Sequence, residues 1–170
     1  MNHMARSAKS RQHRLLVELL FRYGLRISEA LHVRARDVYV GRPSEPLSSY
    51  IKVIGKGKKQ RRVELEQGMA ETLVSGAAGT YIFGNPSTGR PRSIKWANTV
   101  LKRLRGEGGA STHYGRHFAI TEALGAGAPI AEVSRSMGHA DCKTTYEYTN
   151  RREGEGAVRF IDPLDNPVGE

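Results

Sequence analysis

Apolar positions recur with the period of a helix over the first part of the chain. From Arg11 to Tyr23 the leucines fall on one helix face, which predicts an amphipathic helix. Gly24 ends or breaks this helix, and Ser28 stands where an N-cap or early-turn residue is expected, at the start of a second helix over roughly residues 28–33. Arg26 therefore lies at the junction between two predicted helices. Taken alone, it is typical of a solvated arginine at a helix end.

The pattern then changes to short runs enriched in β-branched residues, at residues 37–40, 50–54 and 61–65, which predict strands. The second and third runs are separated by GKGKKQ, which predicts a hairpin with a cationic tip. The lysines of this tip are Lys56, Lys58 and Lys59. Such a tip serves either as a mobile cationic finger or as a solubilising cover for a strand edge.

Helical patterns dominate the remainder of the chain. They cover residues 67–75, 94–105, 113–124, 130–137 and 141–148. Ser93 is the expected N-cap of the helix that begins at residue 94, and Pro129 is expected to begin the helix at residue 130. Neither an internal repeat nor a strong linker divides the chain, and 170 residues suit one domain with a real core.

The charge balance points to a polyanionic partner. The chain carries 27 Lys and Arg against 17 Asp and Glu, a formal net charge of +10, and nucleic acid is the polyanion that this favours. A cationic surface that serves only solubility is the alternative. The single cysteine, Cys142, excludes an intramolecular disulfide and fits a cytoplasmic protein. Since no apolar run approaches the ~20 residues that span a bilayer, we expect no membrane partner.

Groups suited to phosphate chemistry gather between residues 112 and 150. They are His113, Arg116, His139 and Tyr148. An arginine fork binds phosphate oxygens in bidentate fashion and keeps its charge, and a histidine is suited to take a proton from a tyrosine whose pKa is near ~10. Because Asp and Glu do not cluster with His at metal-ligand spacing, we expect neither a metal nor another cofactor.

Four stretches, in order, resemble the catalytic domain of the tyrosine recombinase (phage integrase) family. They are GLRISEAL, GKGKKQRRVEL, HYGRHFAITEALGAG and MGHADCKTTYEYT, and the similarity runs from about Arg11 to Asn150. The resemblance implies an α+β fold, mainly α-helical with a small three-stranded antiparallel sheet. It also implies a metal-independent enzyme of site-specific DNA recombination, as in integration of mobile elements, that cleaves and rejoins strands through a 3′-phosphotyrosyl intermediate.

Three cations of the family motifs map onto this chain. The resemblance implies that Arg26 and Arg116 clamp the scissile phosphate and that Lys56 protonates the leaving 5′ oxygen. Lys58 and Lys59 are then expected to touch backbone phosphates.

The histidines and the nucleophile map in the same way. The resemblance implies that His113 is the general base, that His139 hydrogen-bonds the phosphate and that Tyr148 is the nucleophile. Tyr148 is preferred to Tyr146 because the family tyrosine is followed by threonine. His117 matches a family position as a supporting residue.

Further DNA contacts are expected on the basic face of the helix at residues 94–105, where Lys95 and Arg103 either contact phosphates or are simply solvated. The expected partners are double-stranded DNA and further copies of the chain. These copies form a tetramer in synapsis, and the free protein is a monomer or a weak oligomer.

The expected organisation is a basic stub at residues 1–10, partly a cloning remnant, a catalytic domain at residues 11–150 and a tail at residues 151–170. The tail either docks into a neighbouring protomer or folds back on its own core. Family members usually carry an N-terminal domain that closes around the DNA, and only the stub precedes Arg11 here. Two alternatives to a recombinase stay open: a catalytically inactive DNA-binding accessory protein, and a nicking-closing enzyme of the type IB topoisomerase kind.

Overall fold

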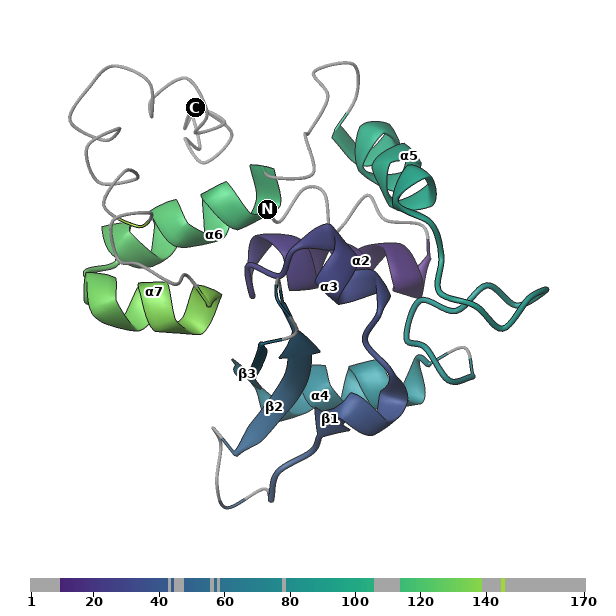
Figure 1. Ribbon diagram of the computed structural model, residues 1–170, viewed down its shortest axis with the longest axis horizontal. Coiled ribbons are helices and arrows are strands. Elements are labelled where there is room, and N and C mark those ends of the chain that lie inside the picture. Colours follow the sequence, from purple (N-terminus) through teal and green to yellow (C-terminus); the bar gives the residue numbers. More distant parts are fainter. Residues whose placement is uncertain are drawn as a thin grey trace, which may run out of the picture.

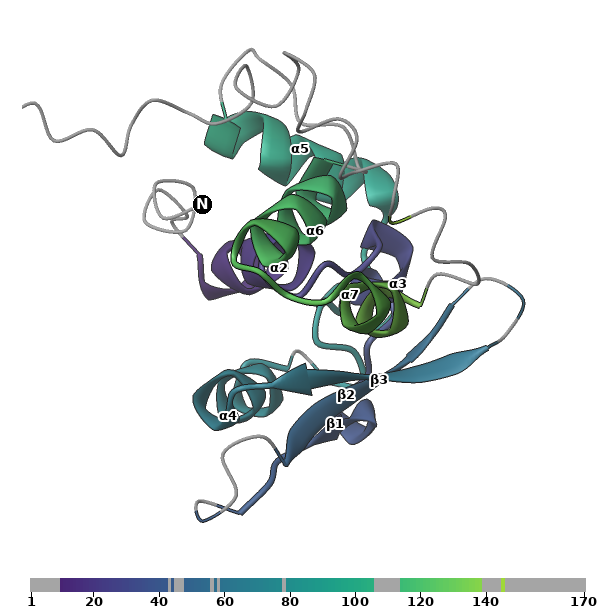
Figure 2. The ribbon, with the colours of Figure 1, turned by 90° about the vertical axis from the view of Figure 1, so that its left-hand side faces the viewer.

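The computed structural model describes residues 10–42, 44, 48–55, 57, 59–77, 79–105, 114–138 and 145. A group of helices lies on one side of a small sheet, and one further helix, α4, lies beside the sheet (Figures 1 and 2). The helices are α2 (Arg11–Phe21), α3 (Ile27–Leu31), α4 (Gln67–Ser75), α5 (Ile94–Arg105), α6 (Tyr114–Gly125) and α7 (Ile130–Met137), with a short 3-10 helix, η1 (Ala35–Asp37). The strands are β1 (Val38–Tyr39), β2 (Ser49–Ile54) and β3 (Gln60–Leu65).

The three strands form an antiparallel sheet in the order β1-β2-β3. Ile51 of β2 lies opposite Val63 of β3, and burial alternates along both strands, so that one face packs on the core. β1 is much shorter than β2 and pairs only with Tyr50 and Ile51. The mainly helical fold with a three-stranded antiparallel sheet is therefore confirmed.

Helix α2 forms the centre of the core. Its apolar face is fully buried, with Leu16, Val17 and Leu19 at 0% exposure, and α3, α5 and α6 all contact it. Burying a leucine of this size stabilises the fold by roughly 1.5–3 kcal/mol. The helix begins where expected because the Ser10 side chain accepts a hydrogen bond from the backbone N–H of His13 at 3.2 Å.

Helix α3 begins one residue earlier than expected, and of the two positions expected for Ser28, N-cap or early turn, the structure shows the early turn. Arg26 occupies the N-cap position, and the carboxylate of Glu29 accepts the backbone N–H of Arg26 at 2.8 Å. Ser28 is exposed within the first turn. A glutamate at the third helical position bonds back to the cap residue, so the helix needs no serine. The predicted cap of α5 is confirmed, since the Ser93 hydroxyl accepts the Trp96 N–H at 3.2 Å.

Helices α6 and α7 pack on each other through a small apolar cluster of their own, formed by Ala119, Ile120, Val133 and Met137. The pair lies against α2 through α6, and α7 also contacts β3. The C-terminal end of α7 is thereby placed near both α3 and the sheet, which decides the geometry of the site. In the described part of the chain, none of the helices combines the length and the apolar character needed to cross a membrane.

Candidate active site

Arg26 stands at the start of α3 and is held there by Glu29. Its Nη1 lies 2.9 Å from the Glu29 carboxylate, and its backbone N–H bonds the same carboxylate. About a third of the Arg26 side chain (34%) stays exposed, whereas Glu29 retains only 2%. The buried carboxylate therefore holds the arginine on its inner side, and the exposed part of the guanidinium is open to a ligand.

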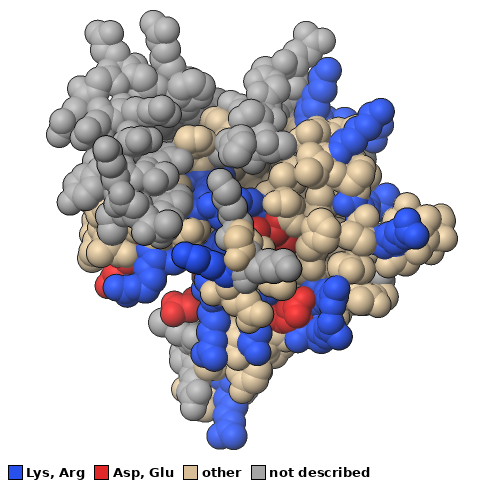
Figure 3. Space-filling view, viewed as in Figure 1, with Lys and Arg blue, Asp and Glu red and all other residues tan. Residues whose placement is uncertain are grey.

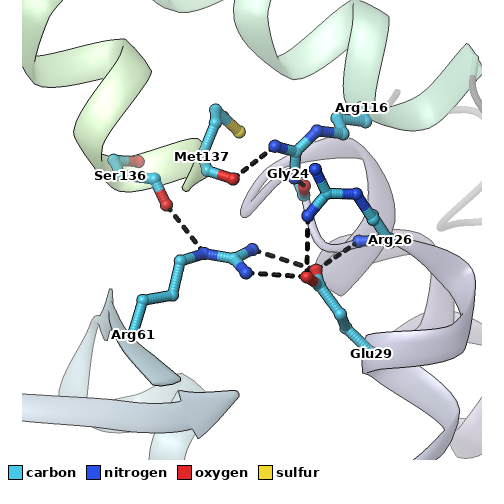
Figure 4. A network of polar contacts seen from close by, with 7 residues as sticks. All are labelled: Gly24, Arg26, Glu29, Arg61, Arg116, Ser136 and Met137. Atoms are coloured by element: carbon cyan, nitrogen blue, oxygen red, sulfur yellow. Dashed lines mark hydrogen bonds and ion pairs between the residues drawn. The ribbon is translucent and has the colours of Figure 1, made fainter. Parts of the chain in front are cut away.

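Arg116 reaches the same place from α6. The residue is buried (6% exposed), and its guanidinium donates to the Gly24 carbonyl at 2.9 Å and to the carbonyl of Met137. Gly24 and Arg116 are 92 residues apart in the chain, and Gly24 lies two residues before Arg26. The fold thus brings together the two arginines that the sequence singled out, and Figure 4 shows them in one cluster.

Arg61 belongs to this cluster and was not among the expected site residues. Its two Nη atoms lie 2.7 and 2.9 Å from the two carboxylate oxygens of Glu29, and its Nε donates to the Ser136 carbonyl at 3.1 Å (Figure 4). A bidentate arginine–carboxylate pair is stronger and more directional than a single contact. Arg61 therefore ties β3 to α3 and to the end of α7.

The sequence carried a signal for Arg61. Residues of equal parity in a strand point to one face, and Arg61 has the parity of Val63 and Leu65, which are both buried. Arg62 and Glu64, of the opposite parity, are exposed. An arginine in phase with buried residues is expected to meet a buried partner.

Two glycines allow the elements to approach this closely. Gly24 has φ +63°, and a Cβ there would lie 2.5 Å from the Met137 side chain. Gly138, the left-handed C-cap of α7 with φ +66°, would place a Cβ 2.7 Å from Cδ of Arg61. At both positions φ is positive, which disfavours residues with a Cβ, and neighbouring side chains leave no space for one. Glycine therefore fits both positions best.

The electrostatics of the cluster favour an anion. Burial by itself would raise the pKa of Glu29, but hydrogen bonds from the Arg61 side chain and the Arg26 backbone, together with the Arg61 charge, hold that pKa below its ordinary value. Glu29 is therefore ionised at neutral pH. One carboxylate is shared by Arg26 and Arg61, and Arg116 adds a third guanidinium, so the cluster carries an excess of positive charge suited to a phosphate.

The remaining expected residues divide into two groups. Lys59, Lys95 and Arg103 are exposed at the surface, as a phosphate contact requires, and His117 is half-buried on α6 next to Arg116. The others lie outside the described residues: Lys56, Lys58, His113, His139, Tyr146 and Tyr148, together with the helix expected at residues 141–148. In the chain, Lys56 follows Gly55, the residue after β2, and His139 follows Gly138, the C-cap of α7.

Figure 3 shows the face seen in Figure 1. Lys and Arg side chains gather over its centre and below it, and Asp and Glu form only small patches between them. This distribution agrees with the net charge of +10 and with a polyanion approaching from this side.

Comparisons with known proteins agree on one family. The profile of the phage integrase family matches residues 1–155. The tyrosine recombinase XerC of Staphylococcus saprophyticus is 30% identical over 156 residues, which cover 84% of this chain and 50% of the relative. The XerC of Bifidobacterium longum is 31% identical over 165 residues, covering 85% and 44%. The chain thus spans about half the length of these recombinases.

Solved structures show the same fold. The XerH site-specific recombinase bound to palindromic difH substrate, in a post-cleavage complex, matches with a TM-score of 0.73 and 22% identity, over 95% of this chain and 50% of that chain. A lambda integrase dimer bound to a COC′ core site matches with a TM-score of 0.67 and 17% identity, over 94% and 58%. Since the family profile covers nearly the whole sequence, the chain belongs to the phage integrase family.

Proposed function

We propose that this chain is the catalytic domain of a site-specific DNA recombinase that cleaves and rejoins strands through a 3′-phosphotyrosyl intermediate. The observation that carries the proposal is the convergence of Arg26 and Arg116 on one carboxylate-supported cluster from distant parts of the chain. Two guanidinium groups held in fixed positions match the extra negative charge that a phosphodiester gains on its nonbridging oxygens when it is attacked.

In this proposal the residues divide the work as the family motifs suggest. Arg26 and Arg116 hold the scissile phosphate, and Tyr148 attacks it, so that a phosphotyrosyl bond forms while the bond to the 5′ oxygen breaks. His113 takes the tyrosine proton, and Lys56 gives a proton to the departing 5′ oxygen. His139 hydrogen-bonds the phosphate. Free energy stored in the phosphotyrosyl bond allows the reverse attack by a 5′ hydroxyl, so that strands rejoin without a cofactor.

The partners in the proposal are double-stranded DNA and further copies of the chain. The two structural relatives bound to difH substrate and to a COC′ core site support DNA as the partner. We also propose that residues 11–150 form the catalytic unit and that residues 151–170 act as a tail that contacts a neighbouring protomer in a tetramer on DNA. A DNA-associated protein of this kind acts in the cytoplasm of a bacterium or in the life cycle of a mobile element.

Trapping the covalent intermediate tests the function directly. The full chain is incubated with a library of nicked duplexes with a randomised core, in which the nick lets the short fragment diffuse away after cleavage. Protein–DNA adducts that survive denaturing electrophoresis are isolated, and sequencing their DNA reports the target. Tyr148→Phe should give no adduct, whereas Tyr146→Phe, the matched control, should react as the natural chain does.

Two outcomes would reject the proposal. If the natural chain binds duplex DNA but forms no adduct with any member of the library, an accessory DNA-binding role replaces catalysis. If Tyr148→Phe still forms the adduct, the nucleophile is assigned to the wrong residue.

A further inference from the structure

A groove of about 490 Å³ lies between α3, η1 and β2. Its walls include one side of α3 with Ser28 and Glu29, the segment from His32 into η1, and three consecutive residues of β2, Lys52 to Ile54. Side chains of consecutive strand residues point to opposite faces. A cavity that touches all three therefore borders the edge of the strand.

That edge has no neighbouring strand within the described residues. β1 pairs only with Tyr50 and Ile51, while β2 continues to Ile54. At the hairpin, the Gly55 N–H donates to the Lys59 carbonyl at 2.8 Å, which makes these residues a hydrogen-bonded pair with β3. Because such pairs alternate along an antiparallel ladder, the N–H groups of Lys52 and Ile54 point away from β3, toward the groove.

Basic side chains surround the groove. They are His32, Arg34, Arg36 and Lys52. Arg34 is held in place by Tyr81, with its guanidinium 5.5 Å from the ring centroid and Nη2 3.5 Å from the hydroxyl. Arg36 and Lys52 are exposed, and neither takes part in a salt bridge within the described part of the chain.

The acidic residues of the groove are already engaged. The Glu29 carboxylate is shared by Arg61 and Arg26, as described above. Asp37 accepts the backbone N–H of Arg34 at 3.1 Å. Arg36 and Lys52 thus face solvent while the carboxylates are turned to internal partners, so the groove presents positive charge.

A pair of like charges on two neighbouring strands also favours a bound anion. Lys52 of β2 and Arg62 of β3 lie directly opposite each other on the exposed face of the sheet. Like charges in such a cross-strand pair destabilise a sheet. A phosphate between or beside them would remove this cost.

The groove adjoins the candidate active site. Glu29, whose carboxylate holds Arg26, also lines the groove, and the lining continues along α3 to His32, the C-cap of this helix. The groove is therefore placed beside a phosphate held at Arg26.

We propose that this groove binds the DNA backbone beside the scissile phosphate, with Arg36 and Lys52 as its phosphate contacts. The inference rests on the proposed function, since it takes DNA as the partner. It adds two contact residues, Arg36 and Lys52, that belong neither to the hairpin sequence GKGKKQ nor to α5.

The salt dependence of binding tests the groove. The affinity of the full chain for a short duplex of arbitrary sequence is measured by fluorescence anisotropy over a series of KCl concentrations. Each phosphate contact contributes about 0.9 to the slope of log K against log salt, so Arg36→Gln combined with Lys52→Gln should reduce the slope by about 1.8. The control, Arg14→Gln combined with Arg22→Gln, removes the same charge from the exposed side of α2 and should leave the slope unchanged.

The outcomes separate the two proposals. A reduced slope at an unchanged melting temperature supports the groove, even if the natural chain forms no covalent adduct and the recombinase proposal fails. A slope equal to that of the natural chain overturns the groove proposal, whether or not the adduct forms. Unchanged DNA binding with altered self-association would overturn it as well, because the open strand edge would then serve a peptide segment of another copy.

Discussion

Replacing Arg61 should lower the unfolding free energy of the protein, because its side chain holds three elements together at the site. Arg61→Met keeps most of the length and apolar stem of the side chain, but it deletes two hydrogen bonds to Glu29 and one to the Ser136 carbonyl. Taking one partner from a buried ion pair costs about 3–5 kcal/mol. Glu29 keeps its two bonds from Arg26, so we expect a loss near the lower limit, about 3 kcal/mol of unfolding free energy.

Urea denaturation at neutral pH measures this loss, and two variants calibrate it. Arg61→Lys keeps the charge but not the planar fork, and we expect it to lose about half as much. Arg62→Met removes the neighbouring arginine, which is exposed and stacks on the Tyr50 ring at 4.7 Å, and it should cost at most about 1 kcal/mol. If Arg61→Met and Arg62→Met lower the unfolding free energy by the same small amount, the pair with Glu29 behaves as a surface ion pair and the reasoning fails.

The pH dependence gives a second readout of the same pair. The folded-state pKa of Glu29 lies below its unfolded value, so its ion pair contributes stability above the unfolded pKa, near ~4.3. This contribution is lost as the pH falls through the lower folded-state pKa. In Arg61→Met the pKa of Glu29 should rise toward or above its ordinary value, and this part of the acid-induced loss should disappear. An unchanged acid limb of the stability curve would contradict the assignment.

Three further predictions follow from the geometry. Arg116→Lys should slow adduct formation by roughly 10²-fold while duplex affinity changes little, because one ammonium nitrogen cannot occupy the two Nη positions that bond separate carbonyls and lacks the planar fork that binds phosphate in bidentate fashion. A quenched-flow adduct assay measures the rate. Gly24→Ala should lower the unfolding free energy in urea denaturation by about 2–4 kcal/mol, because the positive φ strains alanine and its Cβ clashes with Met137. Gly89→Ala has a similar φ but open space around it, and it should lower the unfolding free energy by only about 1–2 kcal/mol. Ser93→Ala should cost about 1 kcal/mol as a lost helix cap, whereas Ser28→Ala should be nearly neutral; equal thermal shifts would refute the cap assignment.

Much of this protein follows from local sequence patterns. The periodicity of the leucines, the three short β runs and the glycine and proline positions predicted most described helices and all three strands to within a few residues. These features depend on interactions between residues close in the chain, which is why pattern alone reveals them. The extent of β1 was overestimated, because residues 35–37 form a 3-10 turn that the alternating pattern does not exclude.

The cap of α3 marks the limit of local reasoning. Ser28 fits an N-cap by residue type, yet Arg26 occupies that position. The buried Glu29 carboxylate accepts the Arg26 backbone N–H, and Arg61 and Arg26 compensate the burial of its charge. The partner of Glu29 lies 32 residues away. Helix-capping preferences, which depend only on residues close in the chain, cannot predict a contact over this separation.

The resemblance to the family motifs pointed to Arg26 and Arg116 as site residues, and this comparison requires only the sequence. Only the tertiary structure added Arg61, and only the short pairing of β1 with Tyr50 and Ile51 leaves the edge of β2 open at the basic groove. Strand register decides both, because a shift by one residue would turn Arg61 to solvent. The sequence thus determined which groups are the candidates for the chemistry, and long-range packing decided what holds Arg26 and Arg116 in place and where a basic groove forms beside them.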